Sequence, residues 1–493
     1  MLLTHASSLA DRESPAGPDR SFRSLVPLVP AAVSSMLYGF TLAPEINAGD
    51  PAELALQAYQ LGVTHPPGYP THTFLGYLFG LPFTDPSVGT RLLSAVCTSV
   101  AVGVASLILL RSTHQVLPSL AAGLILAVIP KIWRAAIVTE VYSVSLCFVA
   151  LTILAGLLWV ERPRRLTLIT SGVLYGVALG ASLANVLLWP GFVVLIAGRA
   201  QHKVRSTLLF VLFTAAAGGI VSSWSYVRSR TLLPIGTEFI PNTLGGFFDH
   251  LSGREYQALQ LNPPMFYLNR VVEHGAIFTR NCFGLGVVLG LIGFAYHVKN
   301  ARLVAASFAI MFAANFGYFT GYAWFDYHTM VNTSYFLFAL WIGLGVARLL
   351  QHPASTFRRA VAIGVPAVIV VGLFAFQIRE RIALRSATPV TDHATAAFEV
   401  LPQGALVVVD WGHLTPMLFF QRVYGRRPDL TLIEGRDKPR HYAWGIVEDG
   451  YRYARQVATD RPVCADTLCA TLDGMEHYAP LAPGWFLYQP PGR

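Results

Sequence analysis

Charged residues are scarce in this chain. Of its 493 residues 13% are charged and 54% are hydrophobic, and only 4 of the 36 basic residues are lysines. The mean hydropathy is +0.50. Soluble domains carry about twice this share of charges, so the composition excludes a soluble enzyme. It indicates a polytopic membrane protein whose backbone polar groups pair within helices.

Several motifs of known chemistry are missing as well. The chain has no P-loop, no G-x-G-x-x-G before a helix, no H-E-x-x-H and no nucleophile elbow. Their absence disfavours ATP-driven transport, dehydrogenase chemistry and zinc proteolysis. No basic stripe interleaved with aromatic residues occurs, which excludes a nucleic-acid partner.

Cysteine is rare too, with five in the chain. Only Cys464 and Cys469 lie close together, and their C-x4-C spacing fits a local disulfide in an oxidising compartment as well as it fits two free thiols. No partners for a metal site accompany them, and we assign no metal ligand.

Apolar stretches of a length suited to membrane spans occur eleven times. They are residues 25–43, 91–110, 116–130, 141–160, 166–182, 186–199, 206–226, 283–298, 302–321, 331–348 and 360–377. With the N-terminus in the cytoplasm, the arginine-bearing loops fall on the cytoplasmic side, as the positive-inside rule requires.

This topology requires that residues 70–83 do not cross the membrane. The stretch has about 14 residues, which is short for a span, and we predict a helix that lies in the interface. The segments then predicted to be extracytoplasmic are residues 44–90, 131–143, 229–281, 321–330 and the tail after 377.

The tail changes in character from the rest of the chain. Residues 404–410 and 429–434 indicate buried strands, with a helix over 414–424 between them, a helical stretch at 442–457 and short strands at 461–464 and 485–488. Alternating strands and helices predict a small α/β domain that packs over the external face of the membrane module.

The first predicted external loop is the most unusual stretch of the sequence. Residues 49–70 read GDPAELALQAYQLGVTHPPGYP, with two carboxylates, one histidine and no lysine or arginine. Asp50 and Glu53 fit a helix start, in which Asp50 is the N-cap and Glu53 closes a capping box. They also fit a carboxylate that takes a proton from an acceptor hydroxyl.

The helix that follows Asp50 is predicted to lie flat on the membrane with Glu53, Gln57 and Gln60 on its exposed side. The HPPGYP segment after it is rigid, since prolines fix the path of the backbone. It leaves His65 and Tyr69 as polar groups that either contact a substrate or belong to a plain connector.

Two further external loops carry candidate site residues. Lys131 and Arg134 break the charge rule, which suggests a lipid phosphate that Arg134 binds with Glu140 orienting it and Tyr142 nearby. Arg134 could equally pair with Glu140 or reach lipid headgroups. The other loop supplies two more candidates, Asp326 and His328, which fit a sugar contact or a solvated turn in an aromatic belt. In the tail, Asp410 with His413 fits a helix cap or a surface pair.

These motifs together resemble a known family. The run DPAELALQAYQLGVTHPPGYP, the later TEVYS element and the external D-Y-H are similar to the DUF2723 membrane family, which includes TMEM260-type protein O-mannosyltransferases. The resemblance is strongest over residues 40–145 and looser beyond them. The family segment commonly reads D-S-G-E-F; here both acids are retained and the glycine is absent.

The resemblance implies a GT-C-type glycosyltransferase fold: a mainly α membrane helical bundle with a small C-terminal α/β domain. It implies a polyprenyl-phosphate sugar donor, reaction outside the cytoplasm and inversion at the sugar carbon. By position, Asp50 corresponds to the general base and Glu53 to the second acid. The implied domains are a cytoplasmic segment 1–24, a GT-C-like module 25–377 and an extracytoplasmic domain 378–493.

We therefore predict a glycosyltransferase of a bacterial plasma membrane that moves mannose from polyprenyl phosphate to a protein Ser or Thr hydroxyl, without a cofactor. Arg134 and Lys131 would stabilise the departing phosphate. The pocket is predicted to be lined by Glu53, His65, Tyr69, Glu140, Tyr142, Asp326 and His328. The alternative, a lipid or polysaccharide transporter or assembly protein, is disfavoured because the spans contain almost no ionisable residues.

Overall fold

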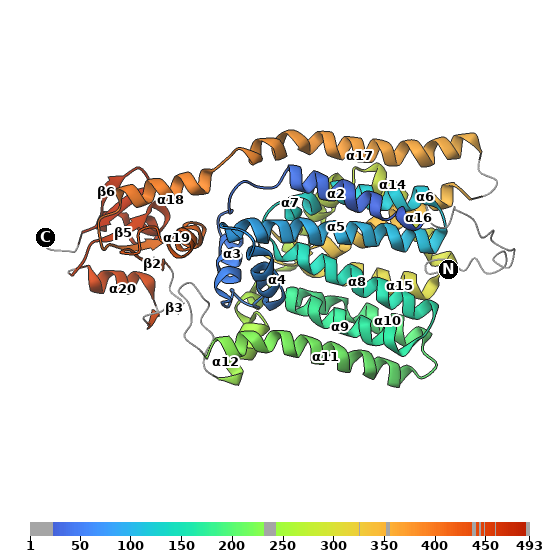
Figure 1. Ribbon diagram of the computed structural model, residues 1–493, viewed down its shortest axis with the longest axis horizontal. Coiled ribbons are helices and arrows are strands. Elements are labelled where there is room, and N and C mark those ends of the chain that lie inside the picture. The colour runs from blue at the N-terminus through green and yellow to red at the C-terminus, as the bar shows by residue number, and fades with distance from the viewer. Residues whose placement is uncertain are drawn as a thin grey trace.

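The computed structural model describes residues 23–230, 243–324, 326–351, 355–435, 440–442, 445–447, 449–458 and 460–489. These residues form a bundle of long apolar helices with a small α/β domain at one end (Figure 1). The predicted fold class, a helical membrane bundle with a C-terminal α/β part, is confirmed. Most of the predicted cytoplasmic segment 1–24 lies outside the described residues.

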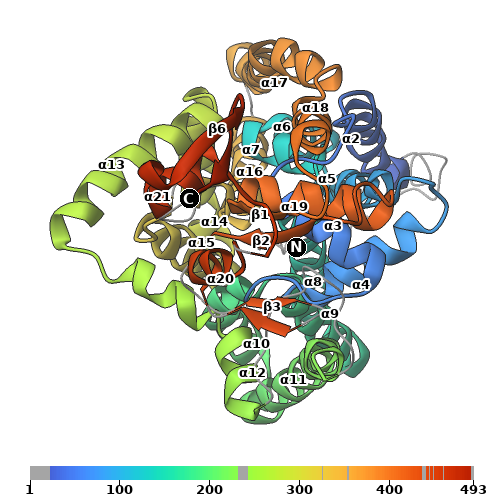
Figure 2. The same ribbon diagram turned by 90° about the vertical axis from the view of Figure 1, so that its left-hand side faces the viewer.

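The bundle helices run largely side by side (Figure 1). In chain order they are α2 (Leu28–Phe40), α5 (Pro86–Thr113), α6 (Val116–Val128), α7 (Pro130–Ala136), α8 (Val141–Glu161), α9 (Arg165–Ala181), the 3-10 helix η1 (Leu183–Leu188), α10 (Trp189–Arg199), α11 (Lys203–Arg228), α14 (Leu285–Asn300), α15 (Arg302–Thr320), α16 (Asn332–Leu349) and α17 (Thr356–Arg385). The helix α13 (Pro264–Asn281) is bent by 97° from α14 and runs across the direction of the bundle (Figure 2).

Each of the eleven predicted apolar stretches contains a helix. By length and composition, five helices of the described chain could cross a membrane, or up to seven if each of two bent pairs is one span. The number of spans therefore stays a prediction. The predicted domain boundary at residue 377 falls inside α17, which continues from the bundle toward the α/β domain (Figure 1).

Two short helices lie across the end of the bundle that faces the α/β domain (Figure 1). They are α3 (Asp50–Gln60) and α4 (Pro70–Gly80), and α4 packs against α3 and α5. This placement agrees with the prediction that residues 70–83 do not cross. The surface helix α12 (Leu244–Leu251), the 3-10 helices η2 (Arg254–Gln260) and η3 (Tyr327–Thr329), and the loops around them lie in the segments predicted to be external.

The predicted exposed polar side of α3 is wrong. Glu53 and Gln57 are both buried, at 1% and 0% exposure. The cause is that α3 is enclosed by groups that its own periodicity does not reveal. His65 of the following loop contacts the Glu53 carboxylate, and α4 and α5 pack on the helix. A helix of the C-terminal domain, α19 (Trp411–Val423), packs on it as well (Figures 1 and 2).

The C-terminal domain is built on a five-stranded sheet of order β2-β1-β5-β7-β6. The parallel strands β2 (Thr431–Glu434), β1 (Leu406–Val409) and β5 (Val463–Asp466) are followed by the antiparallel strands β7 (Trp485–Tyr488) and β6 (Tyr478–Ala482). The domain also contains α18 (Pro389–Val400), α20 (Gly450–Val457), α21 (Thr467–Asp473), η4 (Met475–His477) and a hairpin of β3 (Arg440–Tyr442) and β4 (Gly445–Val447).

The structure corrects one prediction in this domain and decides between two alternatives in another. The helix predicted over 442–457 begins only at Gly450, because the residues before it form the β3–β4 hairpin. The spacing of Cys464 and Cys469 fitted either a disulfide or two free thiols. In the structure both are buried free thiols.

The loop of residues 44–90, predicted to be external, and the C-terminal domain share one hydrophobic core. Ile46, Ala52 and Leu56 pack with residues of α18, β1 and α19. Glu45 adds polar contacts, since its carboxylate accepts hydrogen bonds from the backbone N–H groups of Val390 and Thr391 at 2.9 and 2.8 Å. Burial of this apolar surface fixes the loop against the domain.

Candidate active site

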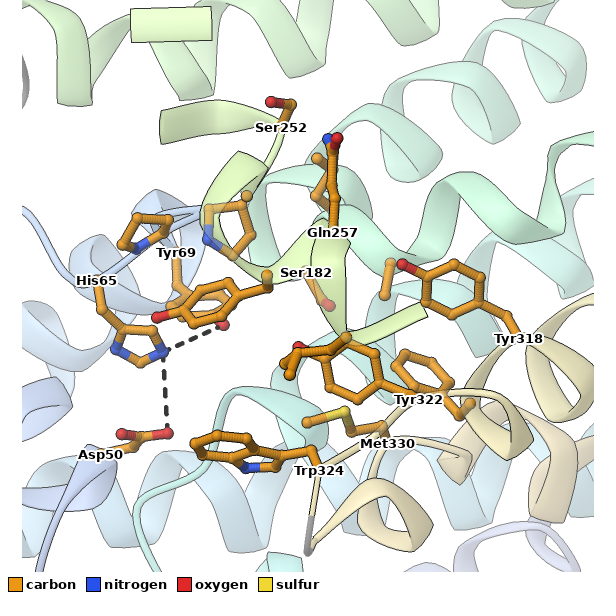
Figure 3. Close-up of a pocket in the computed structure, with 18 of the residues that line it drawn as sticks. Asp50, His65, Tyr69, Ser182, Ser252, Gln257, Tyr318, Tyr322, Trp324 and Met330 are labelled. Carbon is orange, nitrogen blue, oxygen red and sulfur yellow. Dashed lines mark hydrogen bonds and ion pairs between the residues drawn. The ribbon is translucent and has the colours of Figure 1, made fainter. Parts of the chain in front are cut away.

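A cavity of about 580 Å³ opens where the first loop, the bundle end and the C-terminal domain meet (Figure 3). Every segment predicted to be external contributes to its lining. The contributing residues include Asp50, His65 and Tyr69 of the first loop, Tyr142 at the start of α8, Ser252, Gly253, Tyr256, Gln257 and Leu259 around η2, Tyr322, Trp324 and Met330 after α15, and Trp411 and Glu434 of the C-terminal domain. These segments therefore lie at one end of the bundle.

Asp50 begins α3, and its carboxylate is available to the cavity. Gly49, with a φ of +76°, is the residue before the helix, and a positive φ is a conformation that glycine adopts without strain. Asp50 thus lies inside the first turn, and among the described residues its side chain caps no backbone N–H. The capping-box alternative is wrong for Asp50. Its side chain is 55% exposed.

His65 stands between the two acids of the first loop. Its Nε2 lies 3.8 Å from Asp50 Oδ2 (Figure 3), and its Nδ1 contacts Glu53 Oε2. The His65 backbone N–H also donates to Glu53 Oε1 at 2.8 Å. Glu53 is buried behind the imidazole and does not line the cavity. It fixes the orientation of His65, whose Nε2 then faces Asp50 and the cavity.

Tyr69 presents its hydroxyl to the same imidazole, 3.4 Å from His65 Nε2 (Figure 3). Burial, reinforced by the charges of Asp50 and Glu53, holds the pKa of the Tyr69 phenol well above its ordinary value. Tyr69 is therefore neutral at physiological pH and offers an O–H donor to the cavity.

Glu140 precedes α8 near the same groups. Burial raises the pKa of Glu140 to about 8, the charges of Asp50 and Asp326 add to this rise, and Arg134 and His65 oppose it. The carboxyl is therefore largely protonated at neutral pH. Asp50, Asp326 and Arg134 therefore each lie within electrostatic reach of Glu140.

Lys131, His328 and Asp326 form a second cluster at this end of the bundle. Lys131 Nζ lies 3.1 Å from His328 Nε2, and His328 Nδ1 lies 3.2 Å from Asp326 Oδ1. Although burial opposes it, hydrogen bonds from His328 and Thr329 hold the pKa of Asp326 below its ordinary value. None of these three residues lines the cavity. Trp324 and Met330, which are close to Asp326 and His328 in the sequence, do line it.

Arg134 lies on α7, which bends by 67° from α6 at Pro130. No ion pair joins Arg134 to Glu140 among the residues described, so the predicted pairing of these two side chains is not formed. The guanidinium is exposed and has no side-chain or backbone partner in the described chain. A cation in this state is open to an anionic ligand.

Asp50, Glu53 and His65 could also hold a metal ion. One ligand atom from each lies within 4.8 Å of the others. Carboxylate and imidazole ligands suit a divalent cation of the Mn²⁺ or Zn²⁺ type. The close contact between His65 and Glu53 satisfies these two groups without an ion.

Sequence reasoning missed the contributions of the C-terminal domain and of the aromatic wall. Trp411 donates its indole N–H to Asp50 Oδ1 at 2.7 Å, although 361 positions separate the two residues. Tyr318, Tyr322 and Tyr256 line the cavity from α15, its C-terminal loop and η2. No periodicity in the sequence predicts these contacts between distant residues. The only available signal was the concentration of aromatic residues in loops already predicted to be external.

Comparison with known proteins begins with the segment that carries Asp50, His65 and Tyr69. Residues 50–206 match the family described as protein O-mannosyl-transferase TMEM260 N-terminal domain. This region is TMEM260-like. The resemblance predicted from residues 40–145 is confirmed, and the segment with the cavity carboxylates opens the TMEM260-like region.

Two curated relatives carry the same name. The chain is 26% identical over 317 residues to protein O-mannosyl-transferase tmem260 of Dictyostelium discoideum, covering 57% of this chain and 38% of that protein. It is 27% identical over 260 residues to the TMEM260 protein of Mus musculus, covering 50% and 36%. The chain thus spans less than two fifths of the length of these relatives.

Solved structures share the whole fold. ArnT from Cupriavidus metallidurans bound to undecaprenyl phosphate superposes with a TM-score of 0.60 at 13% identity, covering 94% of this chain and 97% of ArnT. The apo state of that protein gives 0.61 at 14% identity with the same coverage. At this identity the likeness establishes the architecture, with its C-terminal domain included.

Proposed function

We propose that the protein is an inverting membrane glycosyltransferase that moves a mannose from polyprenyl phosphate to a Ser or Thr hydroxyl of an acceptor protein. The TMEM260-like relatives, which are named protein O-mannosyl-transferases, support the reaction class. The ArnT fold, solved with undecaprenyl phosphate, supports a polyprenyl-phosphate donor.

One observation carries the proposal: the carboxylate of Asp50 faces a large cavity with one oxygen held by Trp411 and the other near His65. A carboxylate that does not cap its own helix is free to accept a proton. The aromatic and apolar lining of the cavity suits a sugar ring and the first isoprene units of a lipid.

In the proposed reaction Asp50 takes the proton of the acceptor hydroxyl as its oxygen attacks the sugar carbon C1. The bond from C1 to the phosphate oxygen breaks on the opposite side, and its electron pair remains on the phosphate. Tyr69 and His65 position the reacting groups. Arg134 and Lys131 supply positive charge toward the departing phosphate, and the unpaired state of Arg134 supports this role.

We place the cavity on the extracytoplasmic side and the N-terminus in the cytoplasm of a bacterial plasma membrane. The distribution of arginine among the loops supports this orientation, since basic residues gather in loops at the opposite end from the cavity. The lipid-linked donor would enter from the outer leaflet.

The test is a transfer assay with the purified full-length chain in lipid nanodiscs, a defined polyprenyl-phosphate mannose and a Ser/Thr-rich peptide. We expect a product heavier than the peptide by one hexose, with the α or β configuration opposite to that of the donor. Parallel reactions with other sugars on the same lipid identify the donor. Absence of product with every donor and acceptor, in protein that remains folded, would refute the proposal.

A further inference from the structure

The contact between Trp411 and Asp50 crosses from the C-terminal domain to the candidate base. Trp411 is the first residue of α19, and its indole Nε1 donates to Asp50 Oδ1 at 2.7 Å. The ring also stands edge-on to His65, with 6.2 Å between ring centroids. Trp411 therefore contacts both polar groups that the proposed reaction uses on this side of the cavity.

The start of α19 is held firmly on both sides. Thr415 donates its hydroxyl to the carbonyl of Gly49 at 2.8 Å, which ties α19 to the residue just before Asp50. Leu414, Met417 and Leu418 bury their side chains in the core shared with Ala52 and Leu56. Because the two helices share a packed core, the indole approaches Asp50 from a fixed direction.

A network within the sheet fixes Trp411 from behind. Asp410 caps α19 by accepting the N–H of Gly412 at 2.6 Å, and its own N–H donates to Asp466 Oδ2 at 3.0 Å. His413 Nδ1 lies 2.7 Å from Asp410 Oδ2 and 2.9 Å from Asp466 Oδ2. These contacts join the carboxyl ends of β1 and β5 to the first turn of α19, where Trp411 begins.

From this geometry we infer that Trp411 is a positioning residue for Asp50, and that the C-terminal domain completes the active site through it. The indole N–H occupies Oδ1 of the carboxylate, so Oδ2 faces the cavity as the proton acceptor. Without the indole, a carboxylate that is half exposed rotates freely and spends less time in the reactive orientation. The inference rests on the proposed function, because it assigns Trp411 a role in the same transfer.

Trp411→Phe tests this by removing the N–H while keeping an aromatic ring. We expect kcat to fall by about 10- to 100-fold, the range for loss of a hydrogen bond to a charged group, with the KM values for donor and acceptor within about twofold of wild type. Trp411→His keeps a ring N–H of similar reach and should recover part of the lost kcat. Thermal unfolding of the intact protein is recorded for each variant.

The matched control is Trp485→Phe, which makes the same chemical change in β7 of the same domain. Trp485 is buried in the shared core and does not line the cavity. We expect it to lower the unfolding temperature while leaving kcat within about twofold of wild type.

The outcomes separate the two proposals. If wild-type protein makes no product, the proposed function fails. If wild-type protein is active and Trp411→Phe matches it in kcat, the positioning role is overturned and the function stands. If Trp411→Phe and Trp411→His lose kcat and unfolding temperature equally, Trp411 only stabilises the domain, and the inference is again overturned.

Discussion

Two helices that pack on each other beside the cavity, α3 and α19, each have an aspartate at the start, and the two carboxylates have different uses. Asp410 precedes α19 and accepts the N–H of Gly412, as an N-cap does. Asp50 begins α3 one position later relative to its helix and caps no backbone group among the described residues. An aspartate therefore caps α19, whereas the aspartate of α3 leaves its carboxylate open to the cavity. The difference arises because Gly49, and not Asp50, occupies the N-cap position of α3.

The sharpest test of this contrast exchanges each aspartate for alanine. Asp50→Ala should lower the transfer rate by about a thousandfold or more, since it removes the proposed general base, and should change the free energy of unfolding by less than about 0.5 kcal/mol. Asp410→Ala should cost about 1 kcal/mol of unfolding free energy through the lost cap and retain more than a tenth of the activity. Transfer rates and denaturant titrations on both variants provide the measurements.

The comparison also separates what sequence patterns can predict from what they cannot. The apolar stretches predicted the bundle helices, and the strand at 404–410 and helix at 414–424 were found close to their predicted positions, because both patterns are local. Local patterns also singled out Asp50, His65, Tyr69 and Tyr142, all of which line the cavity.

The features that local patterns could not predict depend on tertiary contacts. The exposed polar side of α3 was wrong because tertiary contacts enclose that helix: His65 contacts Glu53, and α4, α5 and the distant α19 all pack on it. The role of Trp411 has the same origin, since no spacing rule links it to Asp50. The roles of Lys131, Arg134, Asp326 and His328 stay predictions, since these residues lie at the same end of the bundle as the cavity but do not line it.

Glu53, the buried acid that contacts His65, provides a further test. Glu53→Gln should lower kcat by about 10- to 100-fold, because the amide cannot hold the His65 imidazole in its orientation as the carboxylate does. The control is Glu273→Gln, whose carboxylate makes an exposed ion pair with Arg270 at 3.1 Å. Steady-state kinetics should show no loss for that control, and equal losses in both variants would argue against an orienting role for Glu53.

The pH profile should carry the signature of Glu140. Folding raises the pKa of this carboxyl from 4.5 to about 8, so it is neutral below pH 8 and charged above it. The new negative charge beside Asp50 and the donor phosphate should reduce kcat/KM severalfold as the pH rises past 8.

Glu140→Gln provides the control for that limb, since its amide stays neutral. Its kcat/KM should remain level from pH 7.5 to about 9, while wild-type activity declines. A decline of the same size in both proteins would assign the alkaline limb to another group. Stability also decreases with pH. Because folding raises the pKa of Glu140, the free energy of unfolding of the wild-type protein falls as the pH rises from 4.5 toward 8.

The smallest effect concerns the cap network of the C-terminal domain. Hydrogen bonds to Asp410 and then to Asp466 raise the pKa of His413 from 6.5 to about 9. Its contribution to stability is therefore complete below pH 6.5 and disappears as the pH rises through 9. Thermal unfolding of the full chain should show a modest decline over this window in wild type, and His413→Gln should show a shallower one.

We propose that Asp50 acts in the chemical step and does not hold the donor. The most direct measurement uses a single preparation of Asp50→Asn to determine both donor affinity and transfer rate in nanodiscs. We expect polyprenyl-phosphate mannose to bind to this variant within about threefold of its wild-type Kd while transfer is lost. Transfer at the wild-type rate by the Asp50→Asn protein would contradict it.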